Sequence, residues 1–176
     1  MPKRADLSDT FCPVGRSAEI LGDRAVLLIL RELFFGRRRF EAIAANTRLG
    51  PQLVSARLRM LEDEGVVARR PYQDRPLRHE YRLTDKGKDL FGVLYAMRGW
   101  AERWAYRDGE TGGGPAIRYV HRACGADVGT SPVCPGCGDV LRYGDLKGEP
   151  SSALRAEQAA RGRQRVSTSS SRISPG

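Results

Sequence analysis

Four residues of the types that bind transition metals lie close together in the last third of the sequence. Two residues separate His121 from Cys124, two separate Cys134 from Cys137, and a glycine follows each pair. A two-residue gap lets both side chains face one ion, and the glycine permits a tight turn that directs backbone N–H groups at the sulfur atoms. Three thiolates and one imidazole complete a tetrahedral ligand set, so the spacing predicts a structural Zn²⁺ site. Ordinary reduced thiols and a redox-active Cys134–Cys137 pair are the alternatives.

The remaining cysteine, Cys12, stands apart near the start of the chain. It directly precedes a predicted helix, and Arg16 follows one turn later. A helix N-terminus and a nearby cation both favour the thiolate form of a cysteine, which is its reactive form. The pattern indicates a reactive thiol at Cys12, with a packing cysteine buried at a dimer interface as the alternative.

The segment 51–64 has the pattern of a helix with one apolar and one polar side. Val54, Leu58 and Leu61 are spaced by four and three residues, which marks the side that faces a protein core. Gln52 and Arg59 lie on the opposite side. A carboxamide can pair with adenine, and a guanidinium with guanine, in the major groove of DNA. The segment is therefore predicted to present Gln52 and Arg59 to base edges.

Further polar side chains around this helix are better placed for DNA phosphates than for bases. An arginine-rich turn follows the helix and lies between two strands predicted at 66–68 and 80–83. A helix beside a basic hairpin is the arrangement with which a winged helix-turn-helix domain binds DNA. The predicted phosphate contacts are Ser55 and Arg57 in the helix and Arg38 and Arg39 ahead of it, and Arg75 and Arg78 in the hairpin are predicted to contact the DNA backbone or the minor groove. For each arginine taken alone, a solvated surface charge is the alternative.

Caps and apolar spacing predict the first helices, which must support this surface. A first short helix begins at Cys12 and Pro13 and closes near Gly22. Asp23 can cap a second helix, whose apolar residues at 25–30 continue nearly all round it, so that it should be buried. A third short helix is predicted at 40–45.

The fourth and last helices have equally clear boundaries in the sequence. Pro51 suits the first position of the fourth helix, and Gly65 ends it. Thr84 can cap a last helix that reaches about residue 106, whose apolar stripe is Leu90, Leu94, Met97, Ala101 and Trp104, widened by Val93 and Trp100. The predicted fold class is mainly α with a small β-hairpin wing, a winged helix-turn-helix.

Composition divides the chain into four parts. These are a winged helix-turn-helix domain at 1–107, a glycine-rich linker at 108–115, a zinc-ribbon-like β unit at 116–147 and a disordered basic Ser/Arg tail at 148–176. Residues 1–110 hold 21 Lys and Arg against 16 Asp and Glu, and the whole chain has a formal charge of +9, which suits a polyanionic partner. The longest apolar run, 25–30, is too short to cross a bilayer, and no signal peptide is apparent, so we expect a cytoplasmic protein.

Four stretches, CPVGRSAEILGDR, LLILRELFFGRRRF, LVSARLRMLEDEGVV and RPYQDRPLRHEYRLTDKG, resemble the HxlR-type winged-helix transcriptional regulators. The resemblance runs from Cys12 to about Trp104, with Ala25 where relatives usually carry a tryptophan. It implies a homodimer, built mainly from the first and last helices, that binds an inverted-repeat DNA operator. It also implies that Cys12 senses oxidants or electrophiles, as an equivalent cysteine does in several such regulators.

The combined expectation is a DNA-binding transcriptional regulator, more often a repressor in such families, that uses the helix at 51–64 and the wing at 69–80. An enzyme is disfavoured because no phosphate-binding glycine loop and no Ser-His-Asp set is present. A thiol oxidoreductase based on Cys134 and Cys137 is the best enzymatic alternative, although no βαβ pattern surrounds the pair. A docking role for the zinc-ribbon-like unit is a third possibility.

Overall fold

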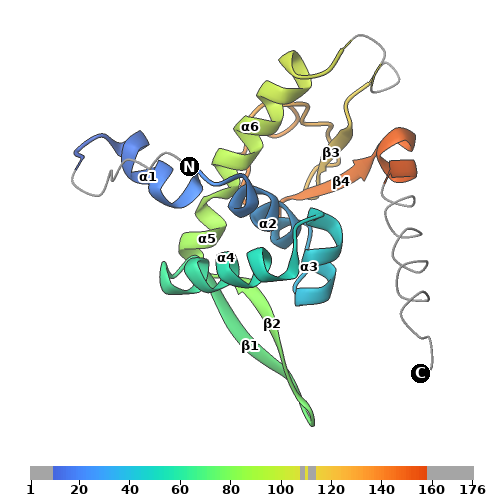
Figure 1. Cartoon of the computed structure of the whole chain (residues 1–176). Coiled ribbons are helices and arrows are strands. Elements are labelled where there is room, and N and C mark those ends of the chain that lie inside the picture. The colour runs from blue at the N-terminus through green and yellow to red at the C-terminus, as the bar shows by residue number, and fades with distance from the viewer. Residues whose placement is uncertain (1–9, 108–109, 111–113, 158–176) are drawn as a thin grey trace. The chain divides into compact units, whose positions relative to one another are not determined.

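The computed structural model describes residues 10–107, 110 and 114–157 of the chain, which form two compact units with a boundary between Lys88 and Asp89 (Figure 1). The first unit contains the helices α1 to α4 and the hairpin of β1 and β2. The second contains α6 and the sheet of β3 and β4, and the short helix α5 (Asp85–Asp89) spans the boundary. Most of the predicted tail, residues 158–176, lies outside the described residues. Within the described part, no helix is both long and apolar enough to span a membrane.

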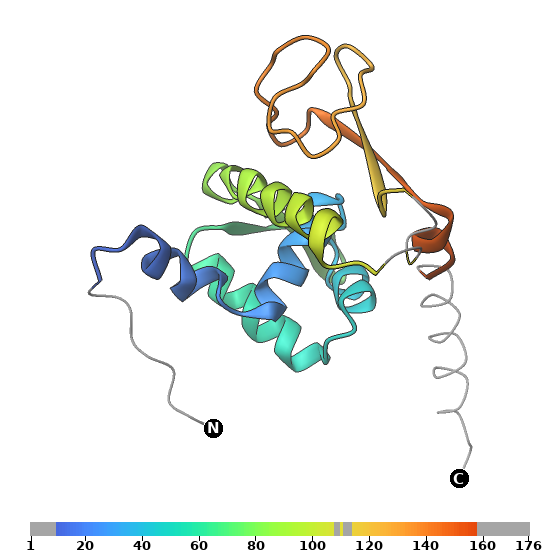
Figure 2. The ribbon, with the colours of Figure 1, turned by 90° about the horizontal axis from the view of Figure 1, so that it is seen from above.

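Three helices enclose the core of the first unit, namely α2 (Arg24–Phe34), α3 (Phe40–Thr47) and α4 (Pro51–Asp63), which are seen together in Figure 2. Their buried side chains recur every three or four residues, as amphipathic helices require. They include Ala25, Val26, Ile29, Leu30 and Leu33 on α2, Ile43 and Ala44 on α3, and Val54, Leu58 and Leu61 on α4. By contrast, α1 (Pro13–Leu21) contacts α2 but buries none of its residues.

The predicted helix signals act where the sequence places them. Asp23 caps α2, because its Oδ1 accepts the backbone N–H of Ala25 at 2.7 Å. Pro51 occupies the first position of α4, and Gly65 follows the helix with a φ of 66°, which favours glycine. The apolar side of α4 faces inward as predicted.

A buried carboxylate joins α2 to the loop that follows it. Glu32 is only 2% exposed, and its two oxygens accept hydrogen bonds from Arg31 Nε at 2.8 Å and Arg37 Nη1 at 2.9 Å. A buried charge is tolerated only when it is paired in this way. Arg37, the first of three consecutive arginines, therefore belongs to the supporting structure of the unit.

The β-hairpin is longer than the sequence predicts. β1 (Val67–Asp74) pairs antiparallel with β2 (Leu77–Leu83), with an irregularity between Pro71 and Gln73, and the hairpin extends away from α3 and α4 of the same unit (Figure 1). The predicted turn at 69–79 was too long, because Arg69, Arg70 and Arg78 take part in the strand pairing. The backbone before α3 adds to the sheet: Arg38 accepts the N–H of Tyr81 at 2.8 Å, and Arg39 forms an isolated bridge with Glu80.

The single last helix predicted from the sequence is two helices, α5 and α6 (Phe91–Trp104), which meet at Leu90. The start was predicted correctly, since Thr84 Oγ1 accepts the N–H of Gly87 at 3.1 Å. The same hydroxyl donates to the carbonyl of Gly65 at 2.7 Å and so fixes the end of the hairpin against the turn after α4.

The second unit is built around α6 and a two-stranded antiparallel sheet of β3 (Ile117–His121) and β4 (Leu146–Pro150). Residues 148–150, which the sequence assigns to the tail, complete β4, and residues 152–157 are helical. The small core of the unit consists of Tyr95, Val128, Cys134 and Leu141, with Phe91, Tyr119, Ala126 and Leu146 packed around it. The winged fold with a C-terminal β unit that carries the cysteines agrees with the predicted fold class.

Candidate nucleic-acid interface and metal centre

The outer face of α4 carries polar side chains directed away from the core. Gln52, Ser55 and Arg59 are exposed, whereas Val54 and Leu58, between them in sequence, are fully buried. Arg59 forms no ion pair with any acidic side chain among the described residues. This face is therefore available to a partner, and its carboxamide, hydroxyl and guanidinium groups can all form hydrogen bonds with DNA.

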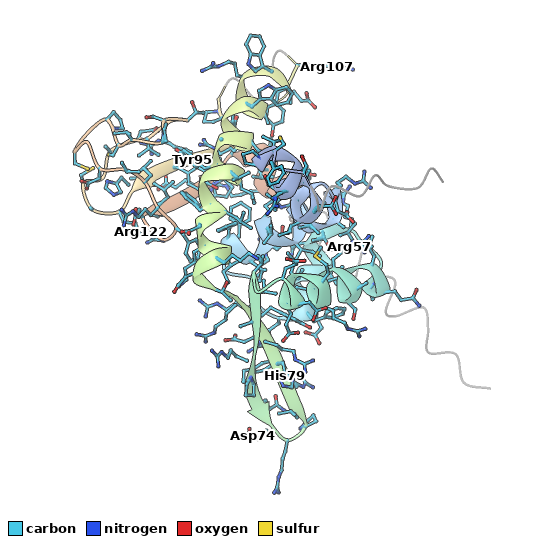
Figure 3. All side chains as sticks on the ribbon, turned by 90° about the vertical axis from the view of Figure 1, so that its left-hand side faces the viewer. Arg57, Asp74, His79, Tyr95, Arg107 and Arg122 are labelled. Carbon is cyan, nitrogen blue, oxygen red and sulfur yellow. The ribbon has the colours of Figure 1, made fainter. Side chains whose placement is uncertain are left out.

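Arg57 has a structural contact that its sequence position does not indicate. Its Nε lies 2.6 Å from Oδ2 of Asp23, the residue that caps α2 (Arg57 is labelled in Figure 3). The guanidinium is about one-third exposed. It therefore links α4 to the start of α2, and any phosphate contact must be made by the part of the group that remains accessible.

The hairpin presents further cations beside α4. Arg75 and Arg78 are exposed near its tip, which Asp74 marks in Figure 3. Arg69 and Arg70 lie exposed on β1, so the basic surface includes strand residues as well as the tip.

The two predicted phosphate contacts ahead of α4 differ in their surroundings. Arg38 and Arg39 are both exposed. The guanidinium of Arg39 lies over the ring of Tyr72, 4.6 Å from its centre, so this arginine is held against β1 by a cation–π contact. Arg38 accepts a hairpin hydrogen bond through its backbone only, which leaves its side chain directed to solvent.

One cation of this surface was missed by the sequence analysis. Arg48 lies in the turn between α3 and α4, is exposed, and has a φ of 58°, the only positive φ of a non-glycine residue in the described part of the chain. Glycine or asparagine is usual in such a conformation. An arginine between two predicted helices was visible in the sequence, but its backbone conformation was not.

The four predicted metal ligands converge in the second unit. Their ligand atoms, one from each of His121, Cys124, Cys134 and Cys137, all lie within 4.8 Å of one another. His121 Nδ1 is 3.3 Å from both Cys124 Sγ and Cys137 Sγ, and Cys124 Sγ is 3.4 Å from Cys134 Sγ. Zn–S and Zn–N bonds of about 2.3 and 2.1 Å place tetrahedral ligands roughly 3.6 Å apart. The donor set and its spacing therefore fit a metal ion such as Zn²⁺.

The backbone around the cluster favours thiolates. Burial opposes ionisation of Cys134, but backbone N–H groups of Cys137 and Gly136, together with the thiols of Cys124 and Cys137, outweigh burial and lower its pKa to about 6. Gly136 has to be a glycine, because a Cβ there would lie 2.7 Å from Cβ of Ala126 and 3.4 Å from Sγ of Cys124. The glycines predicted to permit tight turns are Gly125 and Gly138, which follow the two pairs and have φ of 74° and 79°, values that favour glycine.

Solvent reaches two of the four side chains in the cluster. His121 and Cys134 are buried, while Cys124 and Cys137 are exposed. The N–H of Asp139 favours the thiolate of Cys137, but burial, the Asp139 carboxylate and the neighbouring thiols outweigh it and raise the Cys137 pKa to about 12. A metal ion bound to the sulfur of Cys137 would oppose this effect, because it favours release of the thiol proton.

Cys12 lies at the N-cap of α1 and is exposed. Its carbonyl accepts the N–H of Arg16 at 3.0 Å, and Arg16 Nε donates to the carbonyl of Thr10 at 2.8 Å, so the guanidinium is held close to the N-terminal side of the helix. In the single chain this thiol is not a buried packing residue.

Comparison with known proteins places this architecture among transcriptional regulators. Residues 20–109 match the sequence model of the HxlR-like helix-turn-helix family. Rv3095 of Mycobacterium tuberculosis, an uncharacterised HTH-type transcriptional regulator, is 39% identical over 158 residues, which are 89% of this chain and 98% of that protein. YodB of Bacillus subtilis, an HTH-type transcriptional regulator, is 32% identical over 100 residues, 56% of this chain and 89% of its own.

Two solved structures are similar as well. PA1607, described as a candidate transcription factor, superposes with a TM-score of 0.62 at 34% identity, over 79% of this chain and 94% of its own. The redox regulator HypR in its oxidised form superposes with a TM-score of 0.50 at 28% identity, over 55% of this chain and 99% of its own. The matches to Rv3095 and PA1607 are too long to end at residue 107 and so include part of the cysteine-bearing unit, whereas YodB and HypR match only about half of the chain.

Proposed function

The chain belongs to the HxlR-like helix-turn-helix family, and we propose on this basis that it regulates transcription as a homodimer bound to an inverted-repeat DNA operator. The observation that best supports the proposal is the outer face of α4, where Gln52, Ser55 and Arg59 are exposed beside a basic hairpin. Repression is the mode we favour, because an operator-bound dimer can exclude other proteins from the same DNA. A regulator that binds chromosomal DNA in this way would act in the cytoplasm.

In this proposal α4 enters the major groove and the hairpin lies along the neighbouring backbone. Gln52 and Arg59 contact base edges, since their amide and guanidinium groups match adenine and guanine. Neutralisation of phosphates by the surrounding cations supplies affinity that does not depend on sequence and that falls with salt. The phosphate contacts are Ser55 and the accessible part of Arg57 on α4, Arg75 and Arg78 on the hairpin, and Arg38 and Arg39 beside it.

A substitution at Arg59 tests base recognition directly. The operator is first identified by selection from random DNA, and the preference of Arg59→Ala is then compared with that of the unmodified protein. We expect a loss of about 1–3 kcal/mol at one base pair per half-site. Arg107→Ala is the matched control, because Arg107 is also exposed but lies in the second unit, beyond α6. An unchanged sequence preference in Arg59→Ala would remove this residue from base recognition.

The homodimer is supported by apolar surface that the single chain leaves uncovered. Val93, Met97, Trp100 and Trp104 on α6 are exposed, as are Phe11 and Val14 at the start of α1. Exposed apolar rows of this kind mark sites of association. The first and last helices are also the elements that the family resemblance assigns to dimerisation, so we propose that a second copy covers them.

The metal centre is proposed to be a structural Zn²⁺ site held by His121, Cys124, Cys134 and Cys137. The ion would cross-link the two short loops that carry these ligands, and a closed set of four ligands leaves no position for a substrate. Support comes from the convergence of the donor atoms and from the N–H groups directed at Cys134. Family membership and the absence of an open position both favour this role over dithiol catalysis by Cys134 and Cys137.

Cys12 is proposed to make DNA binding sensitive to oxidants or electrophiles. It is exposed at a helix N-cap, with Arg16 held nearby, and both features favour the reactive thiolate. The similarity to the redox regulator HypR supports such a response. Modification at this position would act on α1, one of the two helices assigned to the dimer.

A further inference from the structure

Helix α6 has two distinct sides. Phe91, Tyr95, Arg98 and Glu102, spaced by four, three and four residues, face the cysteine-bearing part of the second unit. A second row with the same spacing is exposed: Val93, Met97, Trp100 and Trp104 are 43, 46, 64 and 67% accessible. The two rows are offset by two residues, which is roughly 200° around an α-helix. One side of α6 therefore packs within the unit, while the other is open to a partner.

Arg98 anchors the inward side of α6 to the loop that holds Gly129 and to the start of β3. Its Nη1 donates to the carbonyl of Gly129 and its Nη2 to the carbonyl of Ile117, both at 2.7 Å. The guanidinium also lies over the rings of Tyr95 and Tyr119, at 5.4 and 4.5 Å from their centres. The Tyr95 hydroxyl donates to the same Gly129 carbonyl at 3.1 Å (Figure 3 shows Tyr95 on this side of the helix). The position of α6 thus depends on where Gly129 is held.

Gly129 lies in the loop between the two pairs of metal-type ligands. This loop begins after Cys124 and ends at Cys134, so an ion bound to both sulfurs would fix its two ends. Cys134 also shares the core of the unit with Tyr95 of α6. At Gly99, a Cβ would come within 3.2 Å of Cβ of Thr130 in the same loop, which shows how closely the helix and the loop approach.

The core that joins α6 to this loop is very small. It contains four buried residues, Tyr95, Val128, Cys134 and Leu141, one of which is itself a proposed ligand. Apolar burial on this scale does not hold a unit of this size together without a cross-link or a metal. Removal of the ion should therefore release the loop, and with it the hydrogen bonds that hold α6.

We propose that metal binding at His121, Cys124, Cys134 and Cys137 controls self-association of the chain through the outward row of α6. The ion acts as an effector: the metal-bound loop holds α6 in the conformation that presents Val93, Met97, Trp100 and Trp104 to a second copy. This inference rests on both the metal centre and the dimer proposed above. Because linkage between two binding events is reciprocal, self-association must tighten metal binding by the factor by which metal tightens self-association.

The experiment uses the full chain and Zn²⁺ as the probe. Sedimentation velocity gives the dissociation constant of the dimer in metal-loaded protein and after removal of the metal with a chelator. Both tryptophans of the chain, Trp100 and Trp104, lie in the outward row, so their fluorescence provides a second measure of association. We expect metal removal to weaken the dimer about tenfold, within the usual range for coupled sites. The zinc affinity is then measured by chelator competition at chain concentrations below and above the dissociation constant of the dimer. It should change by the same factor between the two concentrations.

Arg98→Met tests the path between the two sites without removing a ligand. Its dimer should no longer depend on metal, or its metal affinity should fall, since either result follows from breaking the contacts of α6 with the loop. Arg103→Met is the matched control: Arg103 is also on α6 but is exposed and has no partner among the described residues. This control should keep the metal dependence of the unmodified protein.

Each failure has a different meaning. A chain that binds zinc and dimerises equally well with and without it overturns the linkage but leaves the metal centre and the dimer intact. A chain that binds no zinc overturns the metal centre, and a chain that stays monomeric in both states overturns the dimer. An Arg98→Met protein with unchanged zinc affinity and unchanged metal dependence overturns the role of Arg98 as the positioning residue.

Discussion

Asp23 and Arg57 form an ion pair between two helices of the first unit, with Oδ2 2.6 Å from Nε. The other carboxylate oxygen of Asp23 caps α2 through the N–H of Ala25. The side chain of Asp23 therefore caps α2 and also forms an ion pair with α4. The outer face of α4 carries Gln52 and Arg59. The orientation of the proposed DNA-contacting face depends on a residue that itself need not contact DNA.

Substitutions at this pair should show how much it contributes to the stability of the chain. Asp23→Ala removes both the cap and the ion pair, and we expect the free energy of unfolding to fall by about 1–2 kcal/mol, mostly from the cap. Arg57→Met should cost less, about 0.5 kcal/mol, because the pair is partly exposed to solvent. Urea unfolding measures both losses. In the double variant the losses should fall short of their sum, whereas strict additivity would show that the two residues do not interact.

Arg48 should matter for DNA binding and hardly at all for stability. Glycine at this position would relieve the left-handed backbone but would lose chain entropy on folding, so Arg48→Gly should change the unfolding free energy by no more than about 0.5 kcal/mol. If Arg48 contacts a phosphate, the same substitution weakens binding to all sequences alike and reduces the slope of log K against log salt by about one. Titrations at several salt concentrations measure this. An unchanged slope would place Arg48 outside the interface.

Modification of Cys12 should release the protein from its operator. Diamide or a quinone, added to the metal-loaded protein, is expected to abolish the mobility shift of the unmodified chain. Cys12→Ser should bind DNA normally before treatment and stay bound after it. Peptide mass spectrometry identifies the modified thiol, because Cys124 and Cys137 are also exposed. Equal release of Cys12→Ser would show that sensing does not require this residue.

The purified chain should contain one zinc ion, and Cys134→Ser should contain none. Cys134 is 1% exposed and shares the core of the second unit, so its loss removes both a ligand and packing. Metal content is measured by atomic emission, and near-ultraviolet circular dichroism follows Tyr95 and Tyr119. Cys12→Ser is the control and should retain its metal. A spectrum that is unaffected by a strong chelator would contradict a structural role for the ion.

Local signals account for much of what the sequence predicts correctly. Asp23, Pro51 and Thr84 occupy the helix starts predicted for them, because caps and proline act within one turn of the chain. The metal-type ligands were equally predictable, since their spacing within each pair already brings the side chains together. The buried side of α4 followed from the spacing of Val54, Leu58 and Leu61.

The features that the sequence did not reveal depend on distant partners. Strand pairing sets the length of the hairpin, so an arginine-rich stretch that resembles a turn continues as β1. Arg57 meets Asp23 across 34 positions. Tyr95 is the only buried residue of α6, yet the predicted apolar stripe of this helix did not include it. Tyr95 is buried by Val128, Cys134 and Leu141, which are distant in sequence, so the spacing of apolar residues within the helix did not reveal this side.

The packing of Tyr95 with Cys134 and Val128 also affects how shorter versions of this protein should be designed. A fragment cut at the glycine-rich linker keeps every proposed DNA contact but strips Phe91 and Tyr95 of their covering, and Arg98 of both carbonyl acceptors. Such a truncation would expose these aromatic side chains to solvent and favour aggregation of the fragment. A well-behaved minimal fragment therefore has to include β4, or else carry polar replacements along the bared side of the helix.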